Sequence, residues 1–141
     1  MVPIPEESPE LAKAVAEGKL GFDTLVVIRR QELNPSHVYT ACAEGFAPGG
    51  GLYVLSPASP DGQLKELVAS PKGQIMDLDV SYDGKEIIFS WRKEAGLGYH
   101  IYHINSDGTG LAQLTDGECH DYNVAWLPDG GVAFISTRAA I

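Results

Sequence analysis

A strand–turn–strand pattern recurs in this chain after 46 residues. The first copy, VSYDGKEIIFSWR, covers residues 80–92, and the second, WLPDGGVAFISTR, covers residues 126–138. In both copies an Asp-Gly pair precedes an apolar stretch that ends near Ser and Arg, which is typical of a tight hairpin between two strands. A looser repeat relates residues 52–67 to 101–114, at spacings of 47 to 49. A period of this length that holds four short strands is typical of a β-propeller blade.

The strand signals begin only after residue 21. Apolar stretches of four to six residues, bounded by turn-forming residues, lie at 25–28, 52–55, 87–91, 99–104 and 132–135. Before them, Ser8 is suited to cap a helix, Pro9 to occupy its first turn, and Gly18 to end the apolar pattern. We therefore expect one short helix over Pro9–Glu17, in an N-terminal lead-in that covers residues 1–21.

The strand count predicts an all-β fold of about two and a half four-stranded antiparallel propeller blades, with a short N-terminal helix. Residues 22–70 supply about three strands, 74–115 supply four, and 121–138 supply two. Closed propellers contain roughly four to eight blades. The region 22–141 is thus expected to be a partial propeller that belongs to a longer protein or closes by self-association. The stretch Phe22–Ile28 is a candidate strand donor between copies.

The alternation of apolar and polar residues along the predicted strands also predicts which side chains form the buried core. Its expected members are Leu25, Val27, Leu52, Val54, Ile88, Ile101, Ile104, Leu114, Trp126 and Phe134.

Charge and composition exclude several classes of function. A net charge of −9 makes the chain a poor general ligand for nucleic acid or anionic membranes. No apolar stretch is long enough for membrane insertion, and the first residues do not resemble a secretory signal. The two cysteines, Cys42 and Cys119, are too few for a zinc site of their own. We expect two buried free thiols, and the alternative is one disulfide in an oxidising compartment.

Residues 127–138, LPDGGVAFISTR, resemble the repeat of TolB-like β-propellers, and the segments 77–92 and 99–117 complete a matching blade. This resemblance covers about residues 51–138. A narrower likeness, carried by IRR, SHVYT and GGGLYVL between residues 28 and 55, is to large secreted bacterial proteins related to the hydrazine synthase alpha subunit. The resemblance implies a periplasmic or secreted location and, for the narrower family, haem or metal chemistry on the propeller.

Two polar segments are candidate ligand sites. His37 and Tyr39 lie in a long link, where they could face a central channel or a metal. Cys119, His120 and Asp121 directly precede the inner strand of a predicted blade, on the face that ligands approach in propellers of this kind. Neighbours in an extended chain point to opposite sides, so Cys119 and His120 are poorly placed to share one metal. The competing interpretation of the Cys119–Asp121 segment is a structural corner, with Asp121 accepting backbone N–H groups.

Arginines follow three of the apolar stretches, at Arg29-Arg30, Arg92 and Arg138. Arginine at the end of a strand usually pairs with a carboxylate or carbonyl of a neighbouring element, and Asp77, Asp79 and Asp121 are the expected partners. Alternatively, Arg92 and Arg138 line a channel that holds an anionic ligand.

The sequence lacks every complete catalytic motif that we sought, so we predict no catalytic residues, no metal ligand set and no bound cofactor. We expect a non-catalytic propeller segment that acts as a binding or protein-interaction scaffold. Its partner would be another protein, or a second copy joined through open blade edges. The alternative is the propeller part of a multihaem redox enzyme similar to the hydrazine synthase alpha subunit.

Overall fold

The computed structural model describes residues 8–32 and 45–139 and consists mainly of β-strands. Strands make up 43% of it and one short helix is present, which confirms a β-rich antiparallel fold. The described elements are α1 (Pro9–Ala16), β1 (Leu25–Arg29), β2 (Gly51–Ser56), β3 (Gln63–Ala69), β4 (Gln74–Val80), β5 (Glu86–Arg92), β6 (His100–Asn105), β7 (Ala112–Gln113), β8 (Asp121–Trp126) and β9 (Val132–Ser136). None of the described helices is long and apolar enough to cross a membrane.

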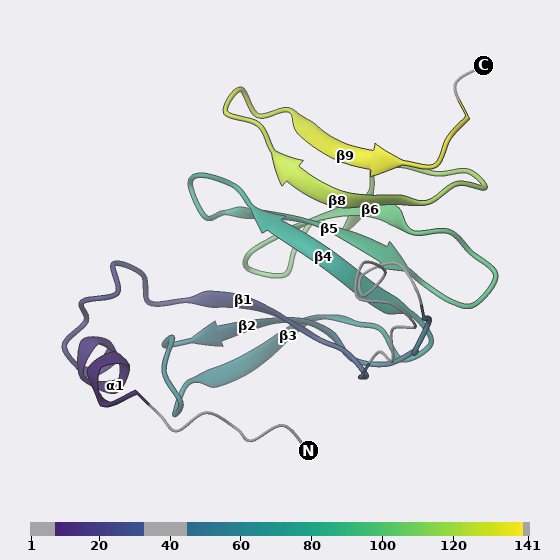
Figure 1. Cartoon of the computed structure of the whole chain (residues 1–141). Coiled ribbons are helices and arrows are strands. Elements are labelled where there is room, and N and C mark those ends of the chain that lie inside the picture. The colour runs from purple at the N-terminus through teal and green to yellow at the C-terminus, as the bar shows by residue number, and fades with distance from the viewer. Residues whose placement is uncertain (1–7, 33–44, 140–141) are drawn as a thin grey trace.

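The strands form three antiparallel sheets that lie one above another (Figure 1). The first sheet has the order β1-β2-β3, the middle sheet β4-β5-β6-β7, and the last sheet β8-β9. Three, four and two strands are the numbers expected for the three segments of the chain. The predicted donor stretch is an exception, because β1 pairs with β2 of its own chain, from Leu25 opposite Leu55 to Arg29 opposite Gly51.

The middle sheet is buried on both faces. Ile87 and Phe89 of β5 join a cluster with Leu52 and Val68 of the first sheet. Ile88, one position along, packs with Val124 of the last sheet. Successive side chains of a strand point to opposite faces, so the consecutive positions 87–89 of β5, which lie between these two layers, are all apolar. Ser90 is also buried, and its hydroxyl group donates a hydrogen bond to Asp77.

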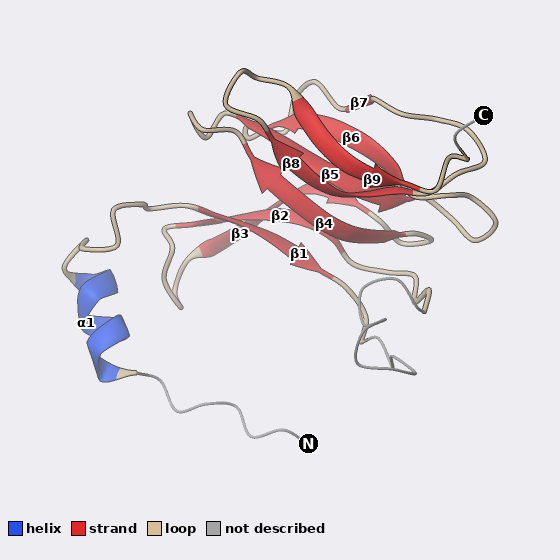
Figure 2. Ribbon diagram, turned by 45° about the horizontal axis from the view of Figure 1, so that its top comes forward, coloured by secondary structure: helices blue, strands red, loops and turns tan. Residues whose placement is uncertain are grey.

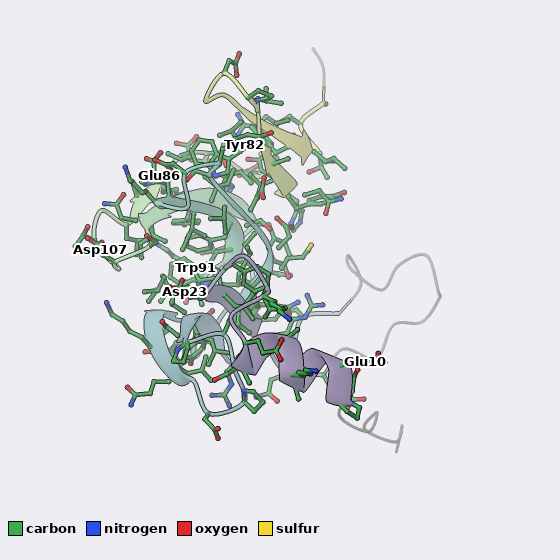
Figure 3. The ribbon with its side chains drawn as sticks, turned by 90° about the vertical axis from the view of Figure 1, so that its left-hand side faces the viewer. Glu10, Asp23, Tyr82, Glu86, Trp91 and Asp107 are labelled. Atoms are coloured by element: carbon green, nitrogen blue, oxygen red, sulfur yellow. The ribbon has the colours of Figure 1, made fainter. Side chains whose placement is uncertain are left out.

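A tryptophan ties the first sheet to the middle one. The indole Nε1 of Trp91 donates a hydrogen bond of 2.8 Å to Oγ of Ser70, which directly follows β3. Its ring meets Tyr102 edge to face, with 5.1 Å between ring centroids. Figure 3 shows Trp91 where the two sheets meet, whereas Tyr82 and Glu86 lie at the β4–β5 hairpin.

A carboxylate clamp links the middle sheet to the last one, and it consists of Asp77 and Asp79 on β4. Asp77 accepts the backbone N–H groups of Asn123 at 3.0 Å and Val124 at 3.2 Å. Asp79 accepts the N–H of Trp126 at 2.7 Å. The expected pairing of Asp77 and Asp79 with arginines is therefore wrong. These carboxylates instead satisfy backbone donors of β8 in the last sheet.

The clamp joins two β-bulges. On β4, Met76 and Asp77 lie opposite a single residue of β5, and on β8, Asn123 and Val124 lie opposite a single residue of β9. A bulge leaves backbone groups outside the sheet ladder, and these need another partner when they are buried. The bulge on β4 therefore presents a carboxylate to the N–H groups that the bulge on β8 leaves over.

The repeated Asp-Gly turns have the same local bonding. Asp83 accepts the N–H of Lys85 at 3.1 Å, and Asp129 accepts the N–H of Gly131 at 2.9 Å. Gly84 and Gly130 both have a positive φ, of 73° and 84°, which glycine adopts without strain. The prediction that both turns use a local Asp-to-backbone bond is confirmed.

Helix α1 stands beside one end of the first sheet (Figure 2). It ends one residue before the predicted boundary, with Gly18 just beyond it in a left-handed conformation. An open apolar hollow separates it from the turn at 57–61.

The predicted core is correct for four residues that face a neighbouring sheet and wrong for residues at the edges of the sheets. Leu52, Ile88, Ile101 and Ile104 are buried. Val27, Val54 and Trp126 are only half-buried. Leu25 on β1 and Phe134 on β9 are each 40% exposed, and Leu114, which directly follows β7, is 52% exposed. These three positions are exposed because β1, β7 and β9 are edge strands of their sheets.

Candidate functional site

The candidate residues within the described chain gather at one end of the sheets. At this end β4, β6 and β8 begin, and β5 and β9 finish, so antiparallel pairing brings together segments that are far apart in sequence. Arg92, Cys119, His120, Asp121 and Arg138 all lie here. His37 and Tyr39, and with them Cys42, lie outside the described residues, so their predicted ligand role stays a prediction.

Asp121 is the fully buried centre of one polar cluster. One carboxylate oxygen accepts a hydrogen bond of 3.1 Å from Nη2 of Arg138 and lies 3.6 Å from Nδ1 of His100. Both oxygens lie 3.8 Å from Sγ of Cys119. Arg138 also donates to the carbonyl of Asp116 at 2.7 Å. The predicted pairing of Arg138 with Asp121 is thus correct. The structural-corner interpretation also holds, except that the bonds to Asp121 come from side chains.

The surroundings of Asp121 favour its charged form. Burial by itself raises the pKa of this carboxyl group. Hydrogen bonds from Ser136, Thr115 and Arg138 outweigh that effect, so that the pKa lies below the usual range of an aspartate. The cluster is therefore a charged, hydrogen-bonded anchor between the starts and ends of neighbouring strands.

Cys119 and His120 face different partners. His120 accepts the backbone N–H of Tyr99 through Nδ1 at 3.2 Å, and its ring lies 5.9 Å from that of Tyr99. Cys119 is half-buried, forms no disulfide with a described residue, and faces Asp121 and Asp116. The two side chains do not form a nucleophile–base pair. They line two separate hollows.

Of these two hollows, the one beside His120 is lined by aromatic side chains. It has a volume of about 290 Å³, at the small end of the ~300–1,000 Å³ typical of ligand pockets. It is lined by Gly45, Phe46, Met76, Arg92, Tyr99, His120, Tyr122 and Thr137. Arg92 and His120 are thus two predicted ligand residues that the fold brings to one cavity, while Asp121 and Arg138 lie in the neighbouring cluster.

Arg92 differs from the other two arginines that end a strand. Arg30 donates to the carbonyl of Met76 at 3.2 Å, and Arg138 binds Asp121. The side chain of Arg92 forms no hydrogen bond or ion pair with any residue in the described ranges. Its buried Nε has no partner, and its guanidinium lies 4.4 Å from the ring centroid of Phe46.

No local sequence signal marks most of the residues that line the hollow, or Gln74, the neutral residue opposite Arg92. Asp77 and Asp121, 44 positions apart, look like equivalent acids in the sequence. In the structure Asp77 lies in a bulge, whereas the first residue of β8, Asp121, corresponds to Gln74, the first residue of β4. Both are fully buried. Gln74 and Asp121 are 47 residues apart. Only the strand boundaries show that this spacing, and not the spacing of 44, relates equivalent positions.

The described residues contain no group of three or more His, Cys, Asp or Glu side chains arranged to hold a metal ion. No protein-family model matches the chain, and no curated protein matches it. The likeness to TolB-like repeats therefore depends on the sequence segments quoted above.

Proposed function

We propose that this chain is a segment of a TolB-like β-propeller that acts as a non-catalytic scaffold, and that its partner is a protein strand or sheet added to its open edges. In the simplest case the partner is a second copy of the chain. The three stacked sheets would then be consecutive blades of the propeller.

The clamp of Asp77 and Asp79 is the observation that carries this proposal. Face-to-face contact between sheets is common to many β-proteins, but here side-chain carboxylates on one inner strand bind the backbone of the inner strand 46 to 47 positions later. A link at the sequence period suits units that follow one another around an axis, as blades do.

The last sheet supports the assembly part of the proposal. It has two strands, whereas the middle sheet has four. Two strands alone are marginally stable in water, and an unpaired strand edge readily accepts a further strand. On β9, Phe134 and Ile135 are 40% and 49% exposed. A partner that extends this sheet would satisfy free backbone groups and cover both side chains.

Light scattering coupled to size-exclusion chromatography tests the proposal. We expect a dimer or trimer rather than a 15.1 kDa monomer, with an interface of at least about 1,000 Å². Ile135→Lys, which places a charge on the edge strand, should shift the chain toward monomer. Leu97→Lys is the matched control, because Leu97 is about as exposed, at 46%, but lies in the connection between β5 and β6 and not on an edge strand.

A wild-type chain that remains monomeric at high concentration would contradict self-association. Equal effects of the two lysine substitutions would show that β9 is not the edge that pairs.

A further inference from the structure

We propose that the hollow beside His120 is a binding site for a small aromatic carboxylate, with Arg92 as its charge partner. This inference goes beyond the scaffold function and does not depend on it, because the hollow is formed within a single chain.

The unpaired guanidinium is the main reason. The Nε of Arg92 is buried without a partner, so the Nη groups are the ones that a ligand in the hollow can reach, and a guanidinium is well suited to bind a carboxylate. Among 19 acidic residues in the chain, none that the structure describes forms an ion pair with Arg92. Phe46 covers one flat face of the group, at 4.4 Å from its centre. Stacking of this kind leaves the N–H edges free for an oxyanion.

The neighbouring sheet provides an internal comparison. There Asp121, at the start of β8, lies opposite Ser136 across the strand pair and binds Arg138, which lies two residues beyond the end of β9. At the start of β4 the corresponding residue is Gln74, which lies directly opposite Arg92 across the strand pair. Its Oε1 accepts the N–H of Ala47 at 2.9 Å, and its buried Nε2 has no partner. A neutral amide thus occupies the place of a carboxylate, and an external anion would supply the missing charge.

The other groups of the hollow suit a carboxylate attached to a flat apolar ring. His120 uses Nδ1 as an acceptor, so the proton of its neutral ring is on Nε2 and provides a further donor. Phe46, Tyr99 and Tyr122 offer aromatic surface. One acidic side chain, Asp77, interacts electrostatically with the hydroxyl group of Tyr99 in the hollow. Its carboxylate oxygens already accept hydrogen bonds from Ser90, Asn123 and Val124.

The charge of the whole protein does not explain such binding. At a net charge of −9, anions are repelled at long range, so affinity for a carboxylate must come from local groups. This makes the site testable with matched probes that differ only in charge.

The experiment is a titration of the isotope-labelled 141-residue chain with benzoate, followed by ¹⁵N-¹H NMR on the backbone amides and the Nε–H of Arg92. We expect saturable shifts that are confined to residues of the hollow. Benzamide, which has the same ring but no charge, should bind at least tenfold more weakly.

Two substitutions locate the charge partner. Arg92→Met should weaken benzoate binding at least tenfold. Gln74→Glu should do the same while keeping Arg92, because it places a carboxylate opposite the guanidinium. Lys93→Met is the matched control. It removes the same charge from the next residue, whose Nζ lies 5.1 Å from the Trp91 ring and 4.9 Å from the Tyr102 ring, and should change affinity less than twofold.

The proposal is overturned if benzoate causes no saturable shift in the wild-type chain, if benzamide binds as tightly as benzoate, or if Lys93→Met weakens binding as much as Arg92→Met. The benzamide comparison needs no substitution, so it decides the matter even if a variant fails to fold.

Discussion

Replacing Asp77 by alanine should separate the last sheet from the middle one. The carboxylate accepts three hydrogen bonds, from Oγ of Ser90 at 2.6 Å and from the N–H groups of Asn123 and Val124. Ser90 is fully buried and Val124 is 7% exposed, so each would lose a partner that water cannot readily replace, at about 1–3 kcal/mol apiece. Asn123 is exposed, and solvent can satisfy its N–H. We therefore expect Asp77→Ala to lower the free energy of unfolding by about 2–6 kcal/mol.

Urea denaturation followed by tryptophan fluorescence measures this loss, and amide hydrogen exchange locates it. The amides of Val124 and Trp126 should exchange faster in the variant, whereas those of β2 should change little. Asp77→Asn keeps one acceptor oxygen and should be affected less. Asp83→Ala, a loss of carboxylate in an exposed turn, is the control. A loss below about 1 kcal/mol for Asp77→Ala, or unchanged exchange in β8, would refute the clamp as a source of stability.

Two further predictions concern the other acidic side chains. Because the folded pKa of Asp121 lies below the unfolded value of about 3.9, its contribution to stability is complete above that pH and is lost as the pH falls through the folded pKa. Asp121→Asn should therefore destabilise the chain by about 1–3 kcal/mol at pH 7 and progressively less in acid; an equal difference at every pH, in urea titrations from pH 7 to 3, would contradict the charged anchor. Asp83→Ala and Asp129→Ala remove the same local bond from two repeated turns, so we expect similar drops in melting temperature by circular dichroism. A large inequality would show that the turns are not equivalent in energy.

Sequence patterns predicted the individual strands and turns well, but they did not predict which faces of the sheets would be covered by a neighbouring sheet. Hairpin turns and strands have local signals, so Pro9, Asp83 and Asp129 mark boundaries that the structure retains. Burial depends on which sheets have a neighbour. Leu52 and Ile88 face another sheet and are buried, while Phe134 has the same local pattern but lies on an outer strand and is exposed.

The candidate site was predictable only in part, for a similar reason. Arg92 and His120 stood out because strand-end arginines and a polar segment before a strand are visible in sequence. Phe46 and Gln74 were missed because long-range pairing brings them to Arg92. The bulge that turns Asp77 toward β8 has no simple sequence signal either, so its carboxylate was assigned the wrong partner.

The carboxylate clamp also sets which positions tolerate substitution. Its donors on β8 are backbone N–H groups, which every residue except proline supplies, so the clamp does not restrict the side chains of Val124 and Trp126. Asn123 is an exception, because its φ of 53° suits asparagine, aspartate and glycine. On the acceptor side the requirement is a short carboxylate at two positions of β4. We therefore expect a random library to retain Asp77 and Asp79 while the side chains that they hold in place vary widely, apart from the packing needs of each.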